Sequence, residues 1–201
     1  MGKELRIGFV TLSMFVLTAC GSVEPPSTPP SDTTSFPPLA DSGFASYTTV
    51  RTFPLPIAQS KTWFETDARI VKAMESTENI AKPVGIVVLE GIWPEAGSVR
   101  RVELSDGHFT MERVIEHDED TFSYQIWGLT SAAGQNIEQV YGEQSWTNLP
   151  NGQSQLSWSY NLKPNAAYKK PFVKKFVKSD ITPFLDTALD KVMKDAETEL
   201  K

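Results

Sequence analysis

The sequence predicts an α+β domain in which an antiparallel sheet of about seven strands lies against a long C-terminal helix. Two observations carry this prediction. Six strand-like runs follow one another between residues 84 and 162, separated by short turns rich in Gly, Pro, Asn and Asp. Apolar residues then recur at helical spacing from residue 172 to residue 196, over a polar opposite face. With 201 residues, 40% of them hydrophobic and 22% charged, the chain has the composition of a globular protein.

The first elements of the domain are a strand and one or two short helices. The strand is expected at residues 47–53, where Pro54 ends it. A helix should begin at Ala58 or Ser60, run to Ala68, and be extended or followed by a second helix over residues 70–79.

The remaining strands are expected at residues 85–90, 98–104, 107–117, 122–127, 137–149 and 153–162. Their short connections make neighbouring strands antiparallel. In the final helix, Pro183 should produce a kink, or start a new helix with Ser179 or Asp180 as its cap.

The N-terminus has the pattern of an export signal. Lys3 and Arg6 precede an apolar run that is too short to span a membrane and typical of a signal peptide. The run ends in Leu17-Thr18-Ala19-Cys20, which resembles the bacterial lipobox, where cleavage precedes an acylated cysteine. We therefore expect a signal peptide at 1–19 and a membrane anchor at Cys20, the only cysteine of the chain. In such lipoproteins an Asp after the cysteine retains the protein in the inner membrane; Gly21 stands there instead, which favours the outer membrane, facing the periplasm.

Residues 20–43 are dense in Pro, Ser and Thr and carry little apolar material. Such a segment buries too little surface to fold alone, so we expect a disordered tether between the acylated cysteine and the domain. The folded domain should then occupy residues 44–201.

Several stretches resemble one superfamily. The runs GSVRRVEL, ERVIEHDED and FSYQIWG are similar to the central hairpins of the polyketide cyclase/dehydrase branch of the SRPBCC (START-like) proteins. IAQSKTW and QLSWSY resemble its first helix and last strand, so the resemblance covers roughly residues 47–199. It implies a helix-grip fold with a cavity between the sheet and the C-terminal helix, suited to a hydrophobic or lipid-like small molecule. It does not imply a hormone receptor, because Ser105-Asp106-Gly107 is shorter than the receptors' gate loop.

Strand alternation and the resemblance together predict the cavity wall. The expected lining residues are Val102, Leu104, Thr110, Glu112, Val114, Tyr124, Ile126, Tyr141, Glu143, Trp158, Tyr160, Phe176, Leu185 and Leu189.

The hairpin around Ser105-Asp106-Gly107 leaves two registers open. A two-residue turn pairs Ser105 with His108, places Val102 opposite Met111, and sends Glu112 to water. A three-residue turn with a left-handed Gly107 pairs Leu104 with His108 and Arg100 with Glu112, and turns His108 and Glu112 into the cavity. The apolar pattern favours the first register, and the resemblance favours the second.

The sequence carries no strong catalytic motif, and we expect no cofactor and no metal. An enzyme would have to use Glu112 with His108 or Arg100 as an acid/base set for cyclisation or dehydration. A purely structural or protein-binding lipoprotein is a further alternative. The net charge of −6 and the lack of a basic stripe argue against a nucleic-acid partner. The acidic turn at residues 116–120, with His117, is expected to be solvated.

Overall fold

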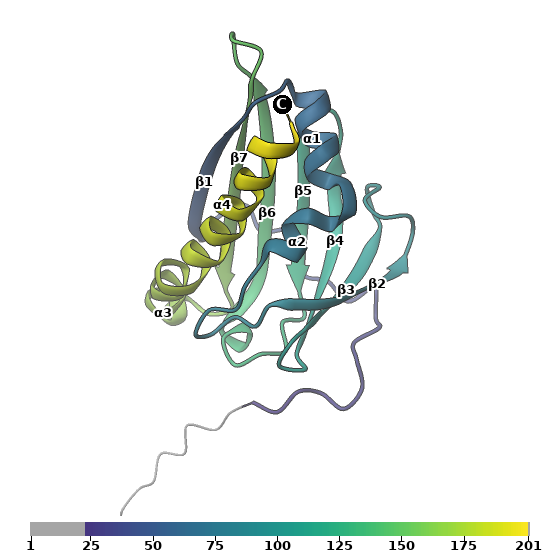
Figure 1. Cartoon of the computed structure of the whole chain (residues 1–201). Coiled ribbons are helices and arrows are strands. Elements are labelled where there is room, and N and C mark those ends of the chain that lie inside the picture. Colours follow the sequence, from purple (N-terminus) through teal and green to yellow (C-terminus); the bar gives the residue numbers. More distant parts are fainter. Residues whose placement is uncertain (1–22, 201) are drawn as a thin grey trace, which may run out of the picture.

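Seven antiparallel strands form one curved sheet in the computed structural model, which describes residues 23–200 (Figure 1). The sheet order is β1-β7-β6-β5-β4-β3-β2, so that only the first strand is out of sequence order. The strands are β1 (Ala45–Phe53), β2 (Pro83–Glu90), β3 (Val99–Leu104), β4 (Phe109–His117), β5 (Thr121–Trp127), β6 (Ile137–Asn148) and β7 (Ser154–Pro164). The predicted fold class is confirmed, with seven strands and a long C-terminal helix.

The helices cover one face of this sheet. They are α1 (Ile57–Glu65), α2 (Arg69–Ala73), α3 (Lys170–Phe176) and α4 (Thr182–Glu199). Figure 1 shows α4 lying across the β1, β7 and β6 side of the sheet, with α1 and α2 beside it. The main core lies between the two layers, where Leu156 and Leu162 of β7 and Leu185 and Leu189 of α4 are fully buried. Within residues 23–200, no helix is long and apolar enough to cross a membrane.

The join between α3 and α4 differs in detail from the expected kink. The chain stays helical and passes through a π-helical turn, Val177–Ile181, before Pro183 enters the first turn of α4. Pro183 stands near the start of α4, where a missing backbone N–H costs no intrahelical hydrogen bond. Asp180 is not a cap: its buried carboxylate accepts hydrogen bonds from Thr77 Oγ1 at 2.9 Å and from the backbone N–H of Asn79 at 3.0 Å.

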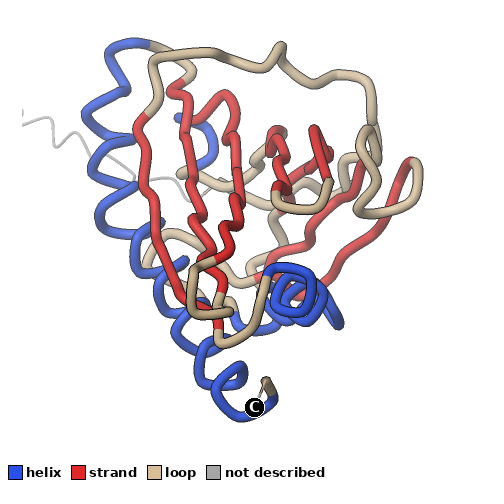
Figure 2. Tube along the Cα trace, turned by 90° about the horizontal axis from the view of Figure 1, so that it is seen from above, coloured by secondary structure: helices blue, strands red, loops and turns tan. Residues whose placement is uncertain are grey.

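Residues 23–43 form an N-terminal strap along the outer face of the sheet, the face that the helices leave uncovered. Figure 2 shows a loop segment crossing the sheet on the side away from α1 and α2. The Phe36 ring lies edge-on to Trp127 of β5, with 5.7 Å between ring centroids, and the Arg113 guanidinium lies 3.7 Å from the Phe36 centroid. Together with Val99 and Met111, Trp127 forms a second small core under this strap.

Hydrogen bonds also hold the strap. The Gln125 amide donates to the Pro37 carbonyl at 3.0 Å, and the Gln139 amide donates to the Pro38 carbonyl at 2.8 Å. Proline offers a carbonyl but no N–H, so these buried amides complement its backbone. The expectation of a disordered tether does not hold for residues 23–43, since they pack against the sheet. Composition alone could not show that the sheet provides this partner surface. Cys20 and the predicted signal peptide lie outside the described residues.

Candidate functional site

The β3–β4 hairpin closes with three residues. The Leu104 N–H donates to the His108 carbonyl at 2.9 Å, and Gly107 has a φ of +83°, in the left-handed region. Arg100 therefore stands opposite Glu112, and Val102 opposite Thr110. The two-residue register, which would have turned Glu112 to water, is wrong.

Arg100 and Glu112 form an ion pair on the inner face of the sheet. Both Nε and Nη2 of Arg100 lie 2.6 Å from Oε2 of Glu112. The two side chains are only 15% and 10% exposed, so the pair is largely removed from water. The Trp93 ring covers the guanidinium, with its centroid 3.7 Å from the Arg100 Cζ, which adds a cation–π contact. The geometry leaves one oxygen of Glu112 for another partner.

This ion pair lies in the wall of a cavity between the sheet and the helices. The cavity has a volume of about 160 Å³ and a mostly apolar lining. Nine of the predicted wall residues line it: Val102, Leu104, Thr110, Glu112, Tyr124, Ile126, Trp158, Tyr160 and Phe176. The sequence missed the contribution of α2 and the segment after it, which provides Ile70, Val71, Met74, Ile80 and Ala81. The apolar spacing of Ile70, Val71 and Met74 is typical of a helix. It does not show that this helix would form one wall of the cavity.

Five predicted wall residues do not line this cavity. Leu185 and Leu189 of α4 are fully buried in the main core. Val114 of β4 is also buried, and none of these three side chains reaches the cavity. Tyr141 and Glu143 are on the outer face, where the Tyr141 hydroxyl donates to Glu143 at 2.8 Å. A register shift between residues 137 and 139 puts Val140, Gly142 and Gln144 on the inner face instead.

Gly142 makes room for an aromatic group in the cavity wall. A Cβ at this position would overlap the Tyr124 ring, which packs against the glycine backbone. Trp158 Nε1 donates to the Tyr124 hydroxyl at 3.1 Å. Burial raises the pKa of Tyr124 well above its usual value, with Tyr160 and Glu112 adding to the rise. Burial and the Glu112 charge also raise the pKa of Tyr160, so both hydroxyls are neutral in the physiological range.

His108 is not part of this site. Its Nδ1 lies 3.0 Å from Thr130 Oγ1, and its Nε2 lies 3.2 Å from the Val23 carbonyl of the strap. Because β4 begins at Phe109, His108 belongs to the turn, and the alternation that would send it inward does not apply. The expected pairing of Glu112 with His108 is therefore wrong, whereas that of Glu112 with Arg100 is present.

Three polar groups of the cavity retain free hydrogen-bonding capacity. Among the described residues, Glu112 Oε1, Arg100 Nη1 and the Gln144 amide take part in no side-chain hydrogen bond, whereas Glu112 Oε2 is bound by Arg100. Buried polar groups in proteins are generally paired, with protein, water or a ligand. The cavity thus offers an acceptor and a donor side by side in an otherwise apolar wall.

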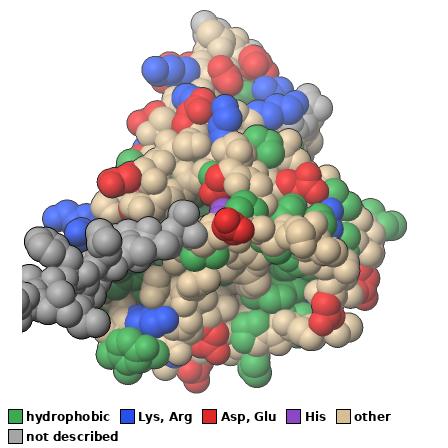
Figure 3. All heavy atoms as spheres, turned by 90° about the horizontal axis from the view of Figure 1, so that it is seen from below, with side chains coloured by type: hydrophobic (Ala, Val, Ile, Leu, Met, Phe, Trp, Pro, Cys, Tyr) green, Lys and Arg blue, Asp and Glu red, His purple; other side chains and the backbone are tan. Residues whose placement is uncertain are grey.

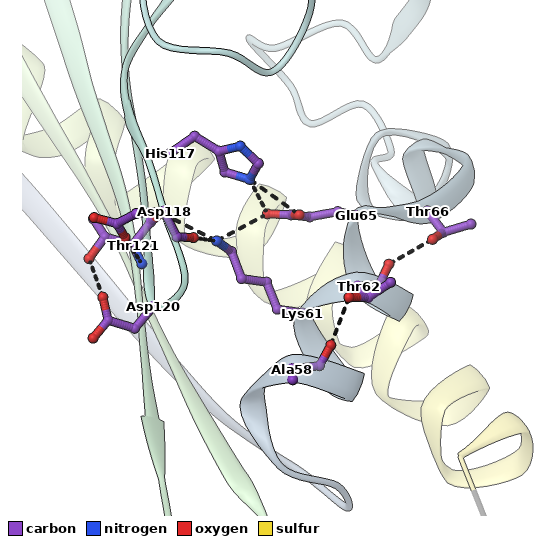
Figure 4. Close-up of polar contacts among 9 residues, drawn as sticks. All are labelled: Ala58, Lys61, Thr62, Glu65, Thr66, His117, Asp118, Asp120 and Thr121. Atoms are coloured by element: carbon purple, nitrogen blue, oxygen red, sulfur yellow. Dashed lines mark hydrogen bonds and ion pairs between the residues drawn. The ribbon is translucent and has the colours of Figure 1, made fainter.

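The acidic turn between β4 and β5 is bound to α1 and is not simply solvated (Figure 4). The buried Lys61 amine donates to the Asp118 carbonyl, and at 3.3 Å to the Thr121 carbonyl. His117 Nε2 lies 3.1 Å from Glu65 Oε1, and its side chain is 24% exposed. No group of three His, Cys, Asp or Glu side chains within residues 23–200 is arranged to hold a metal ion. These contacts fix the β4–β5 turn to α1.

Comparison with solved structures identifies the architecture. The structure of Ara h 8.0201 matches with a TM-score of 0.54 at 19% identity, covering 76% of this chain and 99% of the other. The Zhui aromatase/cyclase from Streptomyces sp. R1128 matches with a TM-score of 0.58 at 14% identity, covering 79% and 97%. The fold is helix-grip.

A third match extends the same pattern. The ginseng major latex-like protein 151 from Panax ginseng has a TM-score of 0.54 at 15% identity, with 76% of this chain and 97% of the other covered. These neighbours are Bet v1-like, SRPBCC-type proteins, which agrees with the resemblance in the sequence. No protein-family model and no curated protein matches the sequence. At these identities the likeness concerns the fold, and function has to be argued from the site.

Proposed function

We propose that this protein binds a small hydrophobic molecule in the helix-grip cavity and holds it by one polar group. The observation that carries the proposal is the Arg100–Glu112 pair in an apolar wall, with one donor and one acceptor left free. Ligand sites typically combine an apolar lining with a few placed polar groups. Binding or carriage of such a molecule accounts for both features of the cavity.

The free groups indicate the polar chemistry of the ligand. Glu112 already neutralises the charge of Arg100, so an anionic ligand would meet a second negative charge at the pair. A hydroxyl can accept from Arg100 Nη1 and donate to Glu112 Oε1 at the same time. We therefore expect neutral alcohols to bind more tightly than carboxylates of the same chain length.

Displacement of a neutral fluorescent probe, N-phenyl-1-naphthylamine, tests the proposal on the chain from Cys20 onward with Cys20→Ser. The probe should bind, and 1-hexanol should displace it at lower concentration than hexanoate. Ile126→Trp fills the cavity and should abolish probe binding, whereas Val50→Trp, at an exposed position of β1, should preserve it. Equal binding by both tryptophan variants would place the probe elsewhere and contradict the proposal.

We further propose that Cys20 is acylated and anchors the domain to the outer membrane on its periplasmic side. The support is the lipobox-like sequence and the Gly21 that follows it. Val23 contacts His108 at the hairpin end of the sheet, and three residues span at most about 10 Å. This would hold the β3–β4 hairpin close to the lipid surface. Cys20→Ser should remove the acyl mass and release the protein from the membrane fraction; continued lipid association would contradict the anchor.

Catalysis is the weaker candidate. A cavity carboxylate would suit a cyclase or dehydratase, and one similar structure is named an aromatase/cyclase. However, the cavity receives Glu112 already bound to Arg100, and His108 lies outside it against Thr130 and the strap. The set of Glu112 with His108 is therefore not assembled, and in the set that is present Glu112 is bound to the permanently charged Arg100, which favours binding over proton transfer.

A further inference from the structure

A groove adjoins the cavity on the side of the sheet edge. It lies between the α1–α2 segment and the strands β2 and β3, and its volume is about 580 Å³, larger than that of the cavity. Its walls include Thr62 and Phe64 of α1, Ile86 and Val88 of β2, and Trp93 of the β2–β3 connection.

The groove and the cavity meet at shared residues. Ile70, Val71, Arg100, Phe122 and Gln144 line both spaces. The two spaces therefore adjoin, and these five residues stand between them. Arg100 stands at this boundary, with Glu112 on the cavity side and Trp93 on the groove side.

The groove wall on β2 is apolar and exposed. Ile86 is 36% exposed and Val88 is 47% exposed, although both lie on the inner side of the sheet, where strands nearer the centre bury their side chains. Seen from below, the molecule exposes hydrophobic side chains among polar and charged ones (Figure 3). Apolar surface that continues from a ligand cavity is a typical mark of a binding site.

We propose that the groove is a second subsite, which receives a second apolar arm of the same ligand. This rests on the proposed function of the cavity. The cavity of about 160 Å³ is smaller than the roughly 300–1,000 Å³ of most ligand sites, and the groove supplies the missing space. The ligand class is then an elongated molecule with a hydroxyl between two apolar arms: one arm in the cavity, the hydroxyl at Arg100 and Glu112, and the other arm in the groove.

Two matched alcohols test this on the chain from Cys20 onward carrying Cys20→Ser, which contains every described element. In 1-hexanol one five-carbon arm is attached to the hydroxyl-bearing carbon, and in 6-undecanol two such arms are attached. With N-phenyl-1-naphthylamine displacement as the readout, 6-undecanol should bind at least tenfold more tightly. Val88→Ser should weaken 6-undecanol roughly threefold to tenfold and leave 1-hexanol within twofold. Val87→Ser, on the same strand but outside both spaces, should change neither.

The outcomes separate the two proposals. If neither alcohol displaces the probe, the cavity proposal fails and the groove proposal fails with it. If both alcohols bind and Val88→Ser changes both or neither, only the groove proposal is overturned. Light scattering measures the oligomeric state. If the chain is a dimer that Val88→Ser converts to a monomer, a second copy of the chain occupies the groove and the subsite proposal is overturned. Should Val88→Ser fail to fold by circular dichroism, Thr62→Trp, which adds bulk to the groove from α1, replaces it with the same expected result.

Discussion

At the residue scale, the identity of the turn decides what Glu112 can do. The alternation of apolar residues along the two strands favours a register in which Met111, and not Glu112, faces the main core. The outer face is also covered, however, since Met111 packs with Val99 and Trp127 under Phe36 of the strap. A strand buried on both faces loses the alternation that register prediction relies on. The apolar pattern alone favoured the wrong register, whereas the family resemblance favoured the register that the structure has.

The first prediction concerns the cost of breaking the ion pair. Glu112→Leu leaves the Arg100 charge largely buried without its partner and should lower the free energy of unfolding by about 3 kcal/mol. The double change Arg100→Met with Glu112→Leu should be less destabilising than Glu112→Leu alone, because no unpaired charge remains. Urea unfolding measures both. A double variant that is less stable than the single one would show that the pair is not acting as a partly buried charge pair.

The second prediction concerns Gly142. Its replacement by Ala places a methyl group against the Tyr124 ring and should cost about 1–3 kcal/mol of stability, with the ring displaced toward the cavity. Gly85→Ala is the matched control, because the atoms it meets belong to the flexible Glu103 side chain. Equal unfolding midpoints for the two variants would contradict the close approach at Gly142.

At the element scale, buried or half-buried carboxylates tie the C-terminal helices to the rest of the fold. Asp186 of α4 accepts from the Tyr47 hydroxyl at 2.6 Å and from Thr49 Oγ1 at 2.7 Å, both on β1. Asp180 ties the π-helical turn to residues 77–79. The sequence predicted the helices well from their apolar spacing, but these polar ties depend on which residues meet in space.

The third prediction is a loss of stability in acid. Burial raises the pKa of Asp186, but the hydrogen bonds from Tyr47 and Thr49 and the charge of Arg51 outweigh it, so that the folded-state pKa lies below the usual value of an aspartate. A depressed carboxyl pKa stabilises the fold above the unfolded-state pKa, and this contribution is lost as the pH falls through the folded-state value. Asp186→Asn should therefore flatten the fall of the unfolding free energy below about pH 5.

Asp190→Asn serves as the control for this titration. Asp190 lies on the same helix and pairs with Arg51 at 2.8 Å, but its side chain is 63% exposed. The Asp190 variant should keep the acid slope of the unaltered chain. If the unfolding free energy of both variants fell with the same slope in acid, the contacts of Asp186 with β1 would not be the cause of the acid sensitivity.

At the scale of the whole molecule, the strap makes the sheet a layer with two covered faces. Composition argued for a tether, because residues 23–43 have little apolar material of their own. The sheet provides the partners that the segment lacks. The Phe36 ring packs against Trp127, and buried glutamine amides donate hydrogen bonds to proline carbonyls. No rule that reads a segment in isolation can find such a partner surface. The main fold was predictable because its signals are periodic and local.

The fourth prediction is that the strap stabilises the domain. A chain that begins at Phe44 should be less stable to urea than one that begins at Val23, by about 2–4 kcal/mol, since it exposes Trp127 and Met111. Phe36→Ala should account for about 1–3 kcal/mol of this loss. Leu39→Ala, at a position 42% exposed on the same strap, should cost less than about 0.5 kcal/mol. Equal stability of the two chain lengths would mean that the strap does not pack on the sheet.

The central claim is that the cavity beside Arg100 and Glu112 holds a hydrophobic molecule, and native mass spectrometry tests it most directly. The chain from Cys20 onward with Cys20→Ser would be purified without detergent and its intact mass recorded before and after addition of 6-undecanol. We predict a co-purified or acquired small-molecule mass at one per chain, which Ile126→Trp removes and Val50→Trp retains. A chain that is consistently empty and acquires no 6-undecanol would contradict the claim.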